Sequence, residues 1–365
     1  MSERIRATYR INAPETESRA RAEALATEQS VEMPLAAVGD PRVLAEVAAK
    51  VEVIRPHGDW FEVVLGLAAS TTGSEASQLV NMLFGNCSLQ PEVELVDVEF
   101  PAGYAKAFPG PRFGIEGIRK LTGAQGRALT CTALKPQGST VEHLAKLART
   151  FALAGIDVIK DDHGLADQAY SPFAQRVPAV QKAIAAANAE TGGRTMYAPT
   201  FSGGPAALAL QARIAKDNGV AMLLVAPMLI GLPAFVELVH GHIDVPVMAH
   251  PAFGGAARVA PAVLLGTLFR MFGADATIFP NHGGRFSFSR ATCLDIAAAA
   301  RRPLQGLKPV LPVPAGGMTV DRVDEMVAGY GKDTMLLIGG GLLTAGERLA
   351  ERTREFVRKV ASIRS

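Results

Sequence analysis

The chain has few cysteines, no excess of either charge and little aromatic character. Its three cysteines are too few and too scattered for a disulfide framework or a zinc site, and they fit a reducing cytoplasm, which we predict as the location. Lys and Arg number 37 and Asp and Glu 35, a net charge of +2, so the composition implies no nucleic-acid partner.

Long hydrophobic runs are also lacking. Residues 219–239 are nearly all apolar, but Pro227, Gly231 and Pro233 interrupt them, which favours a strand, a loop and a helix start over a membrane span. Residues 1–6 have no apolar core of a signal peptide. We therefore expect a soluble protein without a membrane partner.

A unit of about 25 to 35 residues repeats from about residue 125 onward: an apolar run, a polar or Gly/Pro-rich tip, then a helical pattern. Eight such units predict a (β/α)₈ TIM barrel, with a doubly wound open sheet as the less suitable alternative. The expected strands are residues 128–134, 156–160, 195–198, 221–225, 245–249, 276–279, 309–313 and 335–338. The expected helices are 141–153, 173–187, 206–217, 261–272, 320–330 and 345–360.

The first part of the chain has a different pattern. Strand-like runs at 5–11, 51–53 and 60–67 alternate with helical patterns at 15–28 and 41–51. This predicts a small α+β domain over residues 1–110, followed by the barrel over residues 111–365.

Titratable residues follow the second expected barrel strand directly. Residues 155–159 are apolar enough for a strand buried on both faces, and Lys160, Asp161, Asp162 and His163 come next. Such groups are costly to bury without partners, and a hard metal ion or an anionic substrate would supply them.

The other strand ends extend this set, because a TIM barrel keeps its catalytic residues at the carboxyl ends of its strands. Lys135 ends the first strand, His250 the fifth, and Asn281, His282 and Arg285 follow the sixth. Glycine pairs, at Gly316 and Gly317 and at Gly339 and Gly340, end the seventh and eighth. Glycine lets backbone N–H groups approach an anion, so these two tips predict one phosphate site.

These motifs resemble, in order and spacing, those of the large subunit of ribulose-1,5-bisphosphate carboxylase/oxygenase (RuBisCO). The resemblance covers nearly the whole chain and rests on Leu134-Lys135-Pro136, Lys160-Asp161-Asp162, Ala249-His250, Pro314-Ala315-Gly316-Gly317 and Gly339-Gly340-Gly341. In the first domain, Leu83-Phe84-Gly85-Asn86 resembles the family's Asn segment, and Glu28 lies where its N-terminal Glu would fall.

The chain also departs from the carboxylase pattern. His163 replaces a Glu metal ligand, Gln137 a second lysine, Pro251 an arginine and Ala315 a serine, and the mobile-loop lysine has no clear counterpart. The lost Arg and Ser belong to the family's second phosphate site, so a substrate with one phosphate is expected and CO₂ fixation is not. The chain is similar to a form IV, RuBisCO-like protein.

The resemblance implies a metal-stabilised enediolate formed by removing a proton next to a ketone. Mg²⁺ would be held by a carbamate that CO₂ forms on Lys160, by Asp162 and by His163, which is softer than Glu. Lys135 is the expected acid/base, and His250 would bind hydroxyls or carry protons. Substrate contacts would come from Asn281, Arg285, the four tip glycines and, across an obligate homodimer, Asn86 and Glu28.

Three enzyme activities remain open. The first is decarboxylation or C–C cleavage of 3-oxo-isoapionate 4-phosphate, which is preferred slightly because Arg285 could hold a carboxylate and the tips of strands five and six look polar. The others are isomerisation of 5-methylthioribulose 1-phosphate and the methionine-salvage enolase reaction. A non-catalytic binding or regulatory protein is the alternative of another class.

Overall fold

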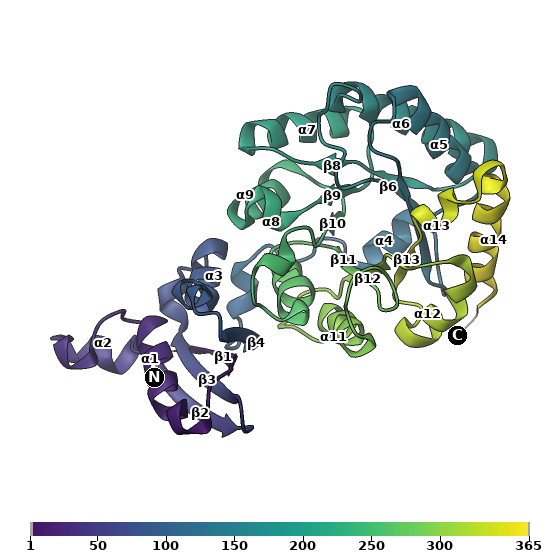
Figure 1. The fold of residues 1–365 in the computed structure, drawn as a ribbon. Helices are drawn as coiled ribbons and strands as arrows, with labels where there is room; N and C mark the ends of the chain where they lie inside the picture. Colours follow the sequence, from purple (N-terminus) through teal and green to yellow (C-terminus); the bar gives the residue numbers. More distant parts are fainter. Residues whose placement is uncertain (1–2, 364–365) are drawn as a thin grey trace. The chain divides into compact units, whose positions relative to one another are not determined.

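The computed structural model describes residues 3–363, which form two compact units (Figure 1). One unit comprises residues 3–108 with the short segments 254–264 and 304–307. The other comprises residues 109–253, 265–303 and 308–363.

The smaller unit is built on an antiparallel sheet with the strand order β2-β3-β1-β4. Its strands are β1 (Arg4–Ile11), β2 (Lys50–Pro56), β3 (Phe61–Ala68) and β4 (Val93–Glu99). Every second residue of β1, from Ile5 to Ile11, is buried, so one face of the strand lies on the hydrophobic core. Leu95 on β4 exchanges backbone hydrogen bonds with residues 258 and 260, which join this unit at the sheet edge.

Helices complete the α+β unit and confirm the predicted class. They are η1 (Glu15–Glu17), α1 (Ser18–Glu28), η2 (Leu35–Ala37), α2 (Pro41–Glu46), η3 (Ala69–Thr72), α3 (Ala76–Phe84), η4 (Asn86–Leu89), η5 (Tyr104–Ala107) and η7 (Gly254–Ala256). The sequence analysis did not predict β4 or α3, and it made α2 five residues too long. Asp40 caps α2 by accepting a hydrogen bond from the N–H of Arg42.

The larger unit is the predicted TIM barrel, nearly closed and parallel. Its strands are β5 (Leu129–Leu134), β6 (Val158–Asp161), β7 (Met196–Ala198), β8 (Thr200–Phe201), β9 (Leu223–Val225), β10 (Val247–Ala249), β11 (Ala276–Pro280), β12 (Leu311–Ala315) and β13 (Met335–Leu337). They lie in the order β7-β6-β5-β13-β12-β11-β10-β9-β8. Since only Pro199 separates β7 from β8, these two are halves of one strand, and eight strand positions result.

Helices surround the barrel strands (Figure 1). In the described residues they are α4 (Gly114–Thr122), α5 (Val141–Leu153), α6 (Phe173–Thr191), α7 (Pro205–Asp217), α8 (Pro227–Ile230), α9 (Leu232–Glu237), η6 (Leu238–His242), η8 (Ala262–Leu268), α10 (Phe269–Met271), α11 (Arg290–Arg301), η9 (Val320–Arg322), α12 (Val323–Tyr330), α13 (Gly340–Leu343), η10 (Gly346–Arg348) and α14 (Leu349–Ser362). Residues 219–239 form β9, α8 and α9, as their Pro and Gly residues predict. Over residues 3–363 there is no helix with the length and hydrophobicity of a membrane span.

Apolar side chains from all around the barrel fill its interior. Leu129, Val158, Leu224, Met248 and Val313 are among the members of one buried cluster that also includes residues of α4. The barrel is therefore a packed core and not a pore, and its chemistry has to lie at its ends.

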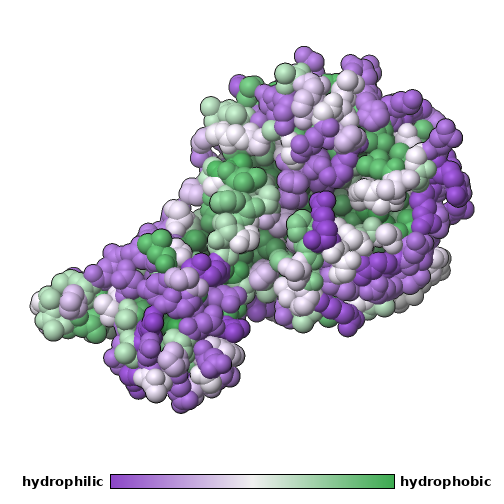
Figure 2. Space-filling model, viewed as in Figure 1, coloured by the Kyte–Doolittle hydropathy of each residue, from purple (hydrophilic) through white to green (hydrophobic). Residues whose placement is uncertain are grey.

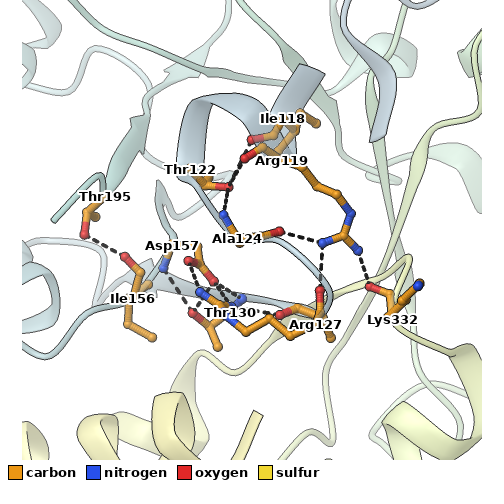
Figure 3. Close-up of polar contacts among 11 residues, drawn as sticks. Ile118, Arg119, Thr122, Ala124, Arg127, Thr130, Ile156, Asp157, Thr195 and Lys332 are labelled. Carbon is orange, nitrogen blue, oxygen red and sulfur yellow. Dashed lines mark hydrogen bonds and ion pairs between the residues drawn. The ribbon is translucent and has the colours of Figure 1, made fainter. Parts of the chain in front are cut away.

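A network of hydrogen bonds among largely buried polar groups lies at the amino-terminal end of the barrel (Figure 3). Asp157, the residue before β6, accepts two hydrogen bonds of 2.7 Å from the Arg127 guanidinium and two more from the N–H and hydroxyl of Thr130. Arg119 donates to the carbonyl groups of Ala124, Arg127 and Lys332 nearby. These contacts tie β5, β6 and the chain before β13 together, a stabilising role typical of this end.

Candidate active site

The predicted acid/base residues Lys135 and His250 and the predicted metal ligand Lys160 lie at the carboxyl end of the barrel. Lys135 follows β5 directly, Lys160 is the third residue of β6, and His250 follows β10 directly. All three strands are parallel members of one sheet, so these ends share one rim.

Asp162 is the centre of this group. The Lys135 ammonium donates to Oδ2 of Asp162, and Nδ1 of His163 lies 2.9 Å from Oδ1. Burial alone would raise the pKa of the Asp162 carboxyl, but the hydrogen bonds from His163 and Lys135 outweigh it and hold that pKa well below its usual range. Asp162 is therefore an ionised carboxylate at neutral pH.

Two imidazoles stack beside Asp162. The rings of His163 and His250 lie 4.2 Å apart between centroids at an interplanar angle of 10°. The N–H of Ala252 donates to Nδ1 of His250 at 3.1 Å, which assigns the ring proton of neutral His250 to Nε2. Burial, reinforced by the positive charge of Lys160, lowers the pKa of His250 to about 2. His250 is thus a neutral hydrogen-bond donor through Nε2–H.

Lys160 is almost completely buried, with 4% of its surface exposed. Its ammonium donates to the carbonyl of Asp161 at 2.9 Å. Burial lowers the pKa of the Lys160 amine. A lower pKa increases the share of the neutral amine, the form that reacts with CO₂.

Asp161 differs from its neighbour Asp162 in all its contacts. Its carboxylate is fully buried and accepts hydrogen bonds from the Arg176 guanidinium, the Tyr197 hydroxyl and the N–H of Thr200. These donors occupy both carboxylate oxygens, so Asp161 is not free to bind a ligand. The sequence analysis missed Arg176 and Tyr197, because no spacing in a sequence links a helix residue to a strand residue 21 positions later.

The two predicted glycine tips differ in their surroundings. At the end of β12, a Cβ on Gly317 would lie 2.3 Å from Cα of Gly284, so close packing of two loops explains this glycine. At the end of β13, a Cβ on Gly339 would lie 3.8 Å from Cε of Lys135, and one on Gly340 would meet no atom within 4 Å. The backbone at Gly339 and Gly340 is therefore not crowded on the side where a Cβ would lie, and at Gly339 this side adjoins the Lys135 side chain.

Asn281 follows β11 directly, as predicted, and its role as a substrate contact stays a prediction. Its side chain is buried, its Nδ2 lies 3.2 Å and 3.1 Å from the sulfurs of Met318 and Met326, and its Oδ1 accepts a hydrogen bond from the Tyr330 hydroxyl at 2.6 Å. Its amide is thus engaged within the packing around β11 and α12. Arg285 is exposed, with its guanidinium 5.2 Å from the ring centre of Phe286.

His282, named with these residues, belongs to a neighbouring cluster. Its Nε2 lies 3.1 Å from Glu325, and Arg322 donates to its carbonyl at 3.1 Å. These contacts fix the loop after β11 to the start of α12.

In the smaller unit, Asn86 and Glu28 are joined by a hydrogen bond, and their role in a site stays a prediction. Nδ2 of Asn86 donates to Oε1 of Glu28 at 2.9 Å and to Oε1 of Glu32 at 2.5 Å. The amide is therefore held between two carboxylates.

Comparisons with known proteins agree with this geometry. Residues 114–254 match the family model described as the catalytic domain of the ribulose bisphosphate carboxylase large chain. Over 363 residues, the chain is 52% identical to ribulose bisphosphate carboxylase-like protein 1 of Rhodopseudomonas palustris, covering 99% of each chain. The chain belongs to the RuBisCO-like proteins. A crystal structure of a Rubisco-like protein from Rhodopseudomonas palustris superposes with a TM-score of 0.94 at 49% identity, covering 100% of this chain and 99% of the other.

A second RuBisCO-like relative has a more specific name. The 5-methylthioribulose-1-phosphate isomerase of Rhodospirillum rubrum is 50% identical over 367 residues, which cover 100% of this chain and 98% of the relative. These two relatives are named as a RuBisCO-like protein and as an isomerase.

The site of this RuBisCO-like protein offers few ligands for a hard cation. Over residues 3–363, no cluster of three or more His, Cys, Asp and Glu side chains has a metal-binding arrangement. Asp162 presents a carboxylate, Asp161 does not, and Nδ1 of His163 is engaged by Asp162. The residues fit Mg²⁺ only if Lys160 adds oxygen ligands as a carbamate, which burial favours by lowering the pKa of the Lys160 amine.

Proposed function

We propose that the chain is an isomerase that removes and returns a proton next to the ketone of a phosphorylated sugar with an apolar end, such as 5-methylthioribulose 1-phosphate. The observation that carries the proposal is that Lys135 and His163 both contact Asp162 at the carboxyl end of the barrel, with His250 stacked on His163. The name of the relative at 50% identity supports this choice of substrate.

The proposed reaction divides its tasks between Lys135 and His250. Lys135 lies at the rim, one-third exposed; as a neutral amine, after giving one proton to solvent, it would take the proton from the carbon next to the ketone, and as the resulting ammonium it would return a proton to the enediolate. Loss of that proton puts negative charge on the ketone oxygen. Nε2–H of the neutral His250 would donate a hydrogen bond to this oxygen without transferring its proton.

Mg²⁺ and CO₂ are part of the proposal. Lys160 as a carbamate and Asp162 would hold the cation, and His163 would orient Asp162 through the bond at 2.9 Å. When bound, the cation would supply positive charge that stabilises an enediolate.

The phosphate end and the thioether end of the proposed substrate each have suitable residues nearby at this rim. The uncrowded backbone at Gly339 and Gly340 would bind one phosphate, and at Gly339 it adjoins Lys135. The sequence analysis interpreted the tips of β10 and β11 as polar, yet Phe253 and Phe286 on these tips are 64% and 51% exposed. Hydrophobic residues also gather over α8 and α9 after β9 (Figure 2), where Leu229 is 59% exposed. Such apolar surface favours a thioether end over a second charged group.

Decarboxylation or C–C cleavage of 3-oxo-isoapionate 4-phosphate is the second candidate. The exposed guanidinium of Arg285 favours it, since this group could hold the carboxylate that the reaction loses. The methylthio enolase reaction uses the same proton chemistry and remains a third outcome of the test.

The assembly is also a proposal. We infer a homodimer in which Asn86 and Glu28 of one chain complete the site of the other, and a division into an N-terminal domain at 1–110 and a catalytic barrel at 111–365. The joint hydrogen bonding of Asn86 and Glu28 supports a shared role. Light scattering of the purified protein would test the dimer, and a stable monomer with full activity would contradict it.

A substrate panel tests the activity. The purified protein would be incubated with Mg²⁺ and bicarbonate and, in turn, with 5-methylthioribulose 1-phosphate, 2,3-diketo-5-methylthiopentyl 1-phosphate and 3-oxo-isoapionate 4-phosphate. We expect an isomeric phosphate from the first in ³¹P and ¹H NMR spectra. CO₂ release from the third without turnover of the first would overturn the proposal in favour of the lyase, and no turnover of any would favour a binding protein.

A further inference from the structure

A buried ion pair lies next to Lys160 and Asp162 of the candidate active site. Asp161 and Arg176 are both 0% exposed, with Nε of Arg176 3.1 Å from Oδ2 of Asp161. The Tyr197 hydroxyl, also inaccessible to solvent, donates to Oδ1 of Asp161 at 2.7 Å. We call Asp161, Arg176 and Tyr197 the Asp161 cluster.

The Asp161 cluster is joined to the two residues that would hold a cation. Lys160 and Asp162 are its neighbours in the chain, and the Lys160 ammonium donates to the carbonyl of Asp161 at 2.9 Å. Thr200 donates through its N–H to Oδ2 of Asp161 and through its hydroxyl to the carbonyl of Asp162, at 3.1 Å and 3.0 Å. The backbone on both sides of Asp161 is therefore fixed to the next strand.

Arg176 extends the same network into the loop that follows β6. Its guanidinium donates to the carbonyl of Ser171 at 2.5 Å and to that of Ala166 at 2.8 Å. The loop between Asp162 and α6 thus has its path set by one buried side chain, which also binds the end of β6.

Stability alone is a poor explanation for this cluster. A buried ion pair gains little over well-packed apolar residues, because both charges lose their hydration. Strand β6 already has a stabilising ion pair at its amino-terminal end, between Asp157 and Arg127. The second buried pair, Asp161 with Arg176, lies at the carboxyl end of the same short strand. A role in holding the adjacent Lys160 and Asp162 in a fixed geometry accounts for its position.

We propose that Asp161, Arg176 and Tyr197 are positioning residues that fix Lys160 and Asp162 as a pair able to bind a divalent cation once Lys160 carries CO₂. The proposal rests on the proposed function for the identity of that cation site. It assigns to three residues outside the site the task of orienting residues within it.

Removal of one oxygen atom from the Asp161 cluster should weaken cation binding. Tyr197→Phe keeps the ring and removes one of the three donors to Asp161, so the carboxylate gains freedom to turn. Residues that orient metal ligands from outside typically contribute about 10–100-fold to metal affinity. We expect Mn²⁺, used as a spectroscopic substitute for Mg²⁺, to bind Tyr197→Phe at least about tenfold more weakly in bicarbonate.

Tyr104→Phe is the matched control. Tyr104 is buried in the smaller unit, and its hydroxyl forms a hydrogen bond with that of Thr72 at 2.5 Å. The variant removes the same chemical group from a buried site, so it reports the general cost of a lost hydroxyl. Thr200→Val is a second probe, because it removes only the donor to the carbonyl of Asp162 and keeps the side-chain shape.

The experiment measures Mn²⁺ binding by electron paramagnetic resonance and the Lys160 carbamate by ¹³C NMR after addition of ¹³C-bicarbonate. The proposal predicts weaker Mn²⁺ binding and less carbamate in Tyr197→Phe and Thr200→Val, with wild-type values in Tyr104→Phe. Wild-type binding in a folded Tyr197→Phe and Thr200→Val would overturn the positioning role and leave the proposed function standing. Absence of Mn²⁺ binding and of carbamate in the wild type would overturn the cation site of the proposed function, and the positioning role with it.

Discussion

Replacing Lys135 by Met separates two roles that the structure gives to this lysine. The change keeps most of the side-chain volume and removes the ammonium that donates to Oδ2 of Asp162. If Lys135 transfers the proton, turnover should fall by about 10²–10⁴-fold, the usual contribution of a positioned acid or base. This range corresponds to about 3–5 kcal/mol of the activation barrier.

The same ammonium also competes with a cation for Asp162. A hydrogen bond to a charged group contributes about 1.5–3 kcal/mol, and the lower value applies here because one-third of the Lys135 side chain is exposed. Since about 1.4 kcal/mol is a factor of ten in affinity, Lys135→Met should bind Mn²⁺ as tightly as the wild type or up to about tenfold more tightly.

The assay combines steady-state kinetics on 5-methylthioribulose 1-phosphate with Mn²⁺ titration of the same samples. Slow turnover together with undiminished Mn²⁺ affinity supports a proton-transfer role. Turnover within about threefold of the wild type would refute Lys135 as the acid/base. A parallel loss of Mn²⁺ affinity would instead show that Lys135 acts by maintaining the cation site.

Further changes test other parts of the structure. Asp157→Asn breaks the buried pair with Arg127 and should lower the free energy of unfolding by about 3 kcal/mol in urea titrations while kcat is retained. The pKa of Asp162 lies below its ordinary 3.8 in the folded protein, so its stabilising contribution is complete above that value and is lost as the pH falls through the folded pKa. Asp162→Asn should therefore lose less stability than the wild type between pH 5.5 and 3 in urea titrations, and equal losses would contradict this sign. Gly317→Ala, with its Cβ 2.3 Å from Cα of Gly284, should cost about 1–3 kcal/mol in thermal unfolding. Gly340→Ala should unfold like the wild type but show a raised KM, because its Cβ enters only the proposed phosphate space.

The sequence predicts the barrel well because its signals are local. Each apolar run followed by a helical pattern corresponds to an observed strand and helix, and α5 has the predicted bounds. Strand β4 was missed although Val93, Leu95 and Val98 are buried along it, since two residues, Val96 and Asp97, separate the last two and break the alternation.

The site was predictable only where residues adjoin strand ends. Lys135, Lys160, Asp162 and His250 follow from that rule, whereas Asn281 also follows a strand but turns into the packing of Met318 and Met326. Direction of a side chain and pairing across the barrel depend on tertiary structure, which no local pattern contains. The exposure of Phe253 also depends on tertiary structure and could not be predicted from the sequence. Its φ of 66° is uncommon for a bulky residue.

The central claim is that this rim moves a proton at the carbon beside a ketone, and isotope exchange tests it most directly. The wild type and Lys135→Met would be incubated in D₂O with 5-methylthioribulose 1-phosphate, Mg²⁺ and bicarbonate, and the recovered phosphates examined by ¹H NMR and mass spectrometry. The account predicts deuterium at the carbon beside the ketone with the wild type and almost none with Lys135→Met. Product formed by the wild type without deuterium at that carbon, or equal incorporation by both proteins, would contradict it.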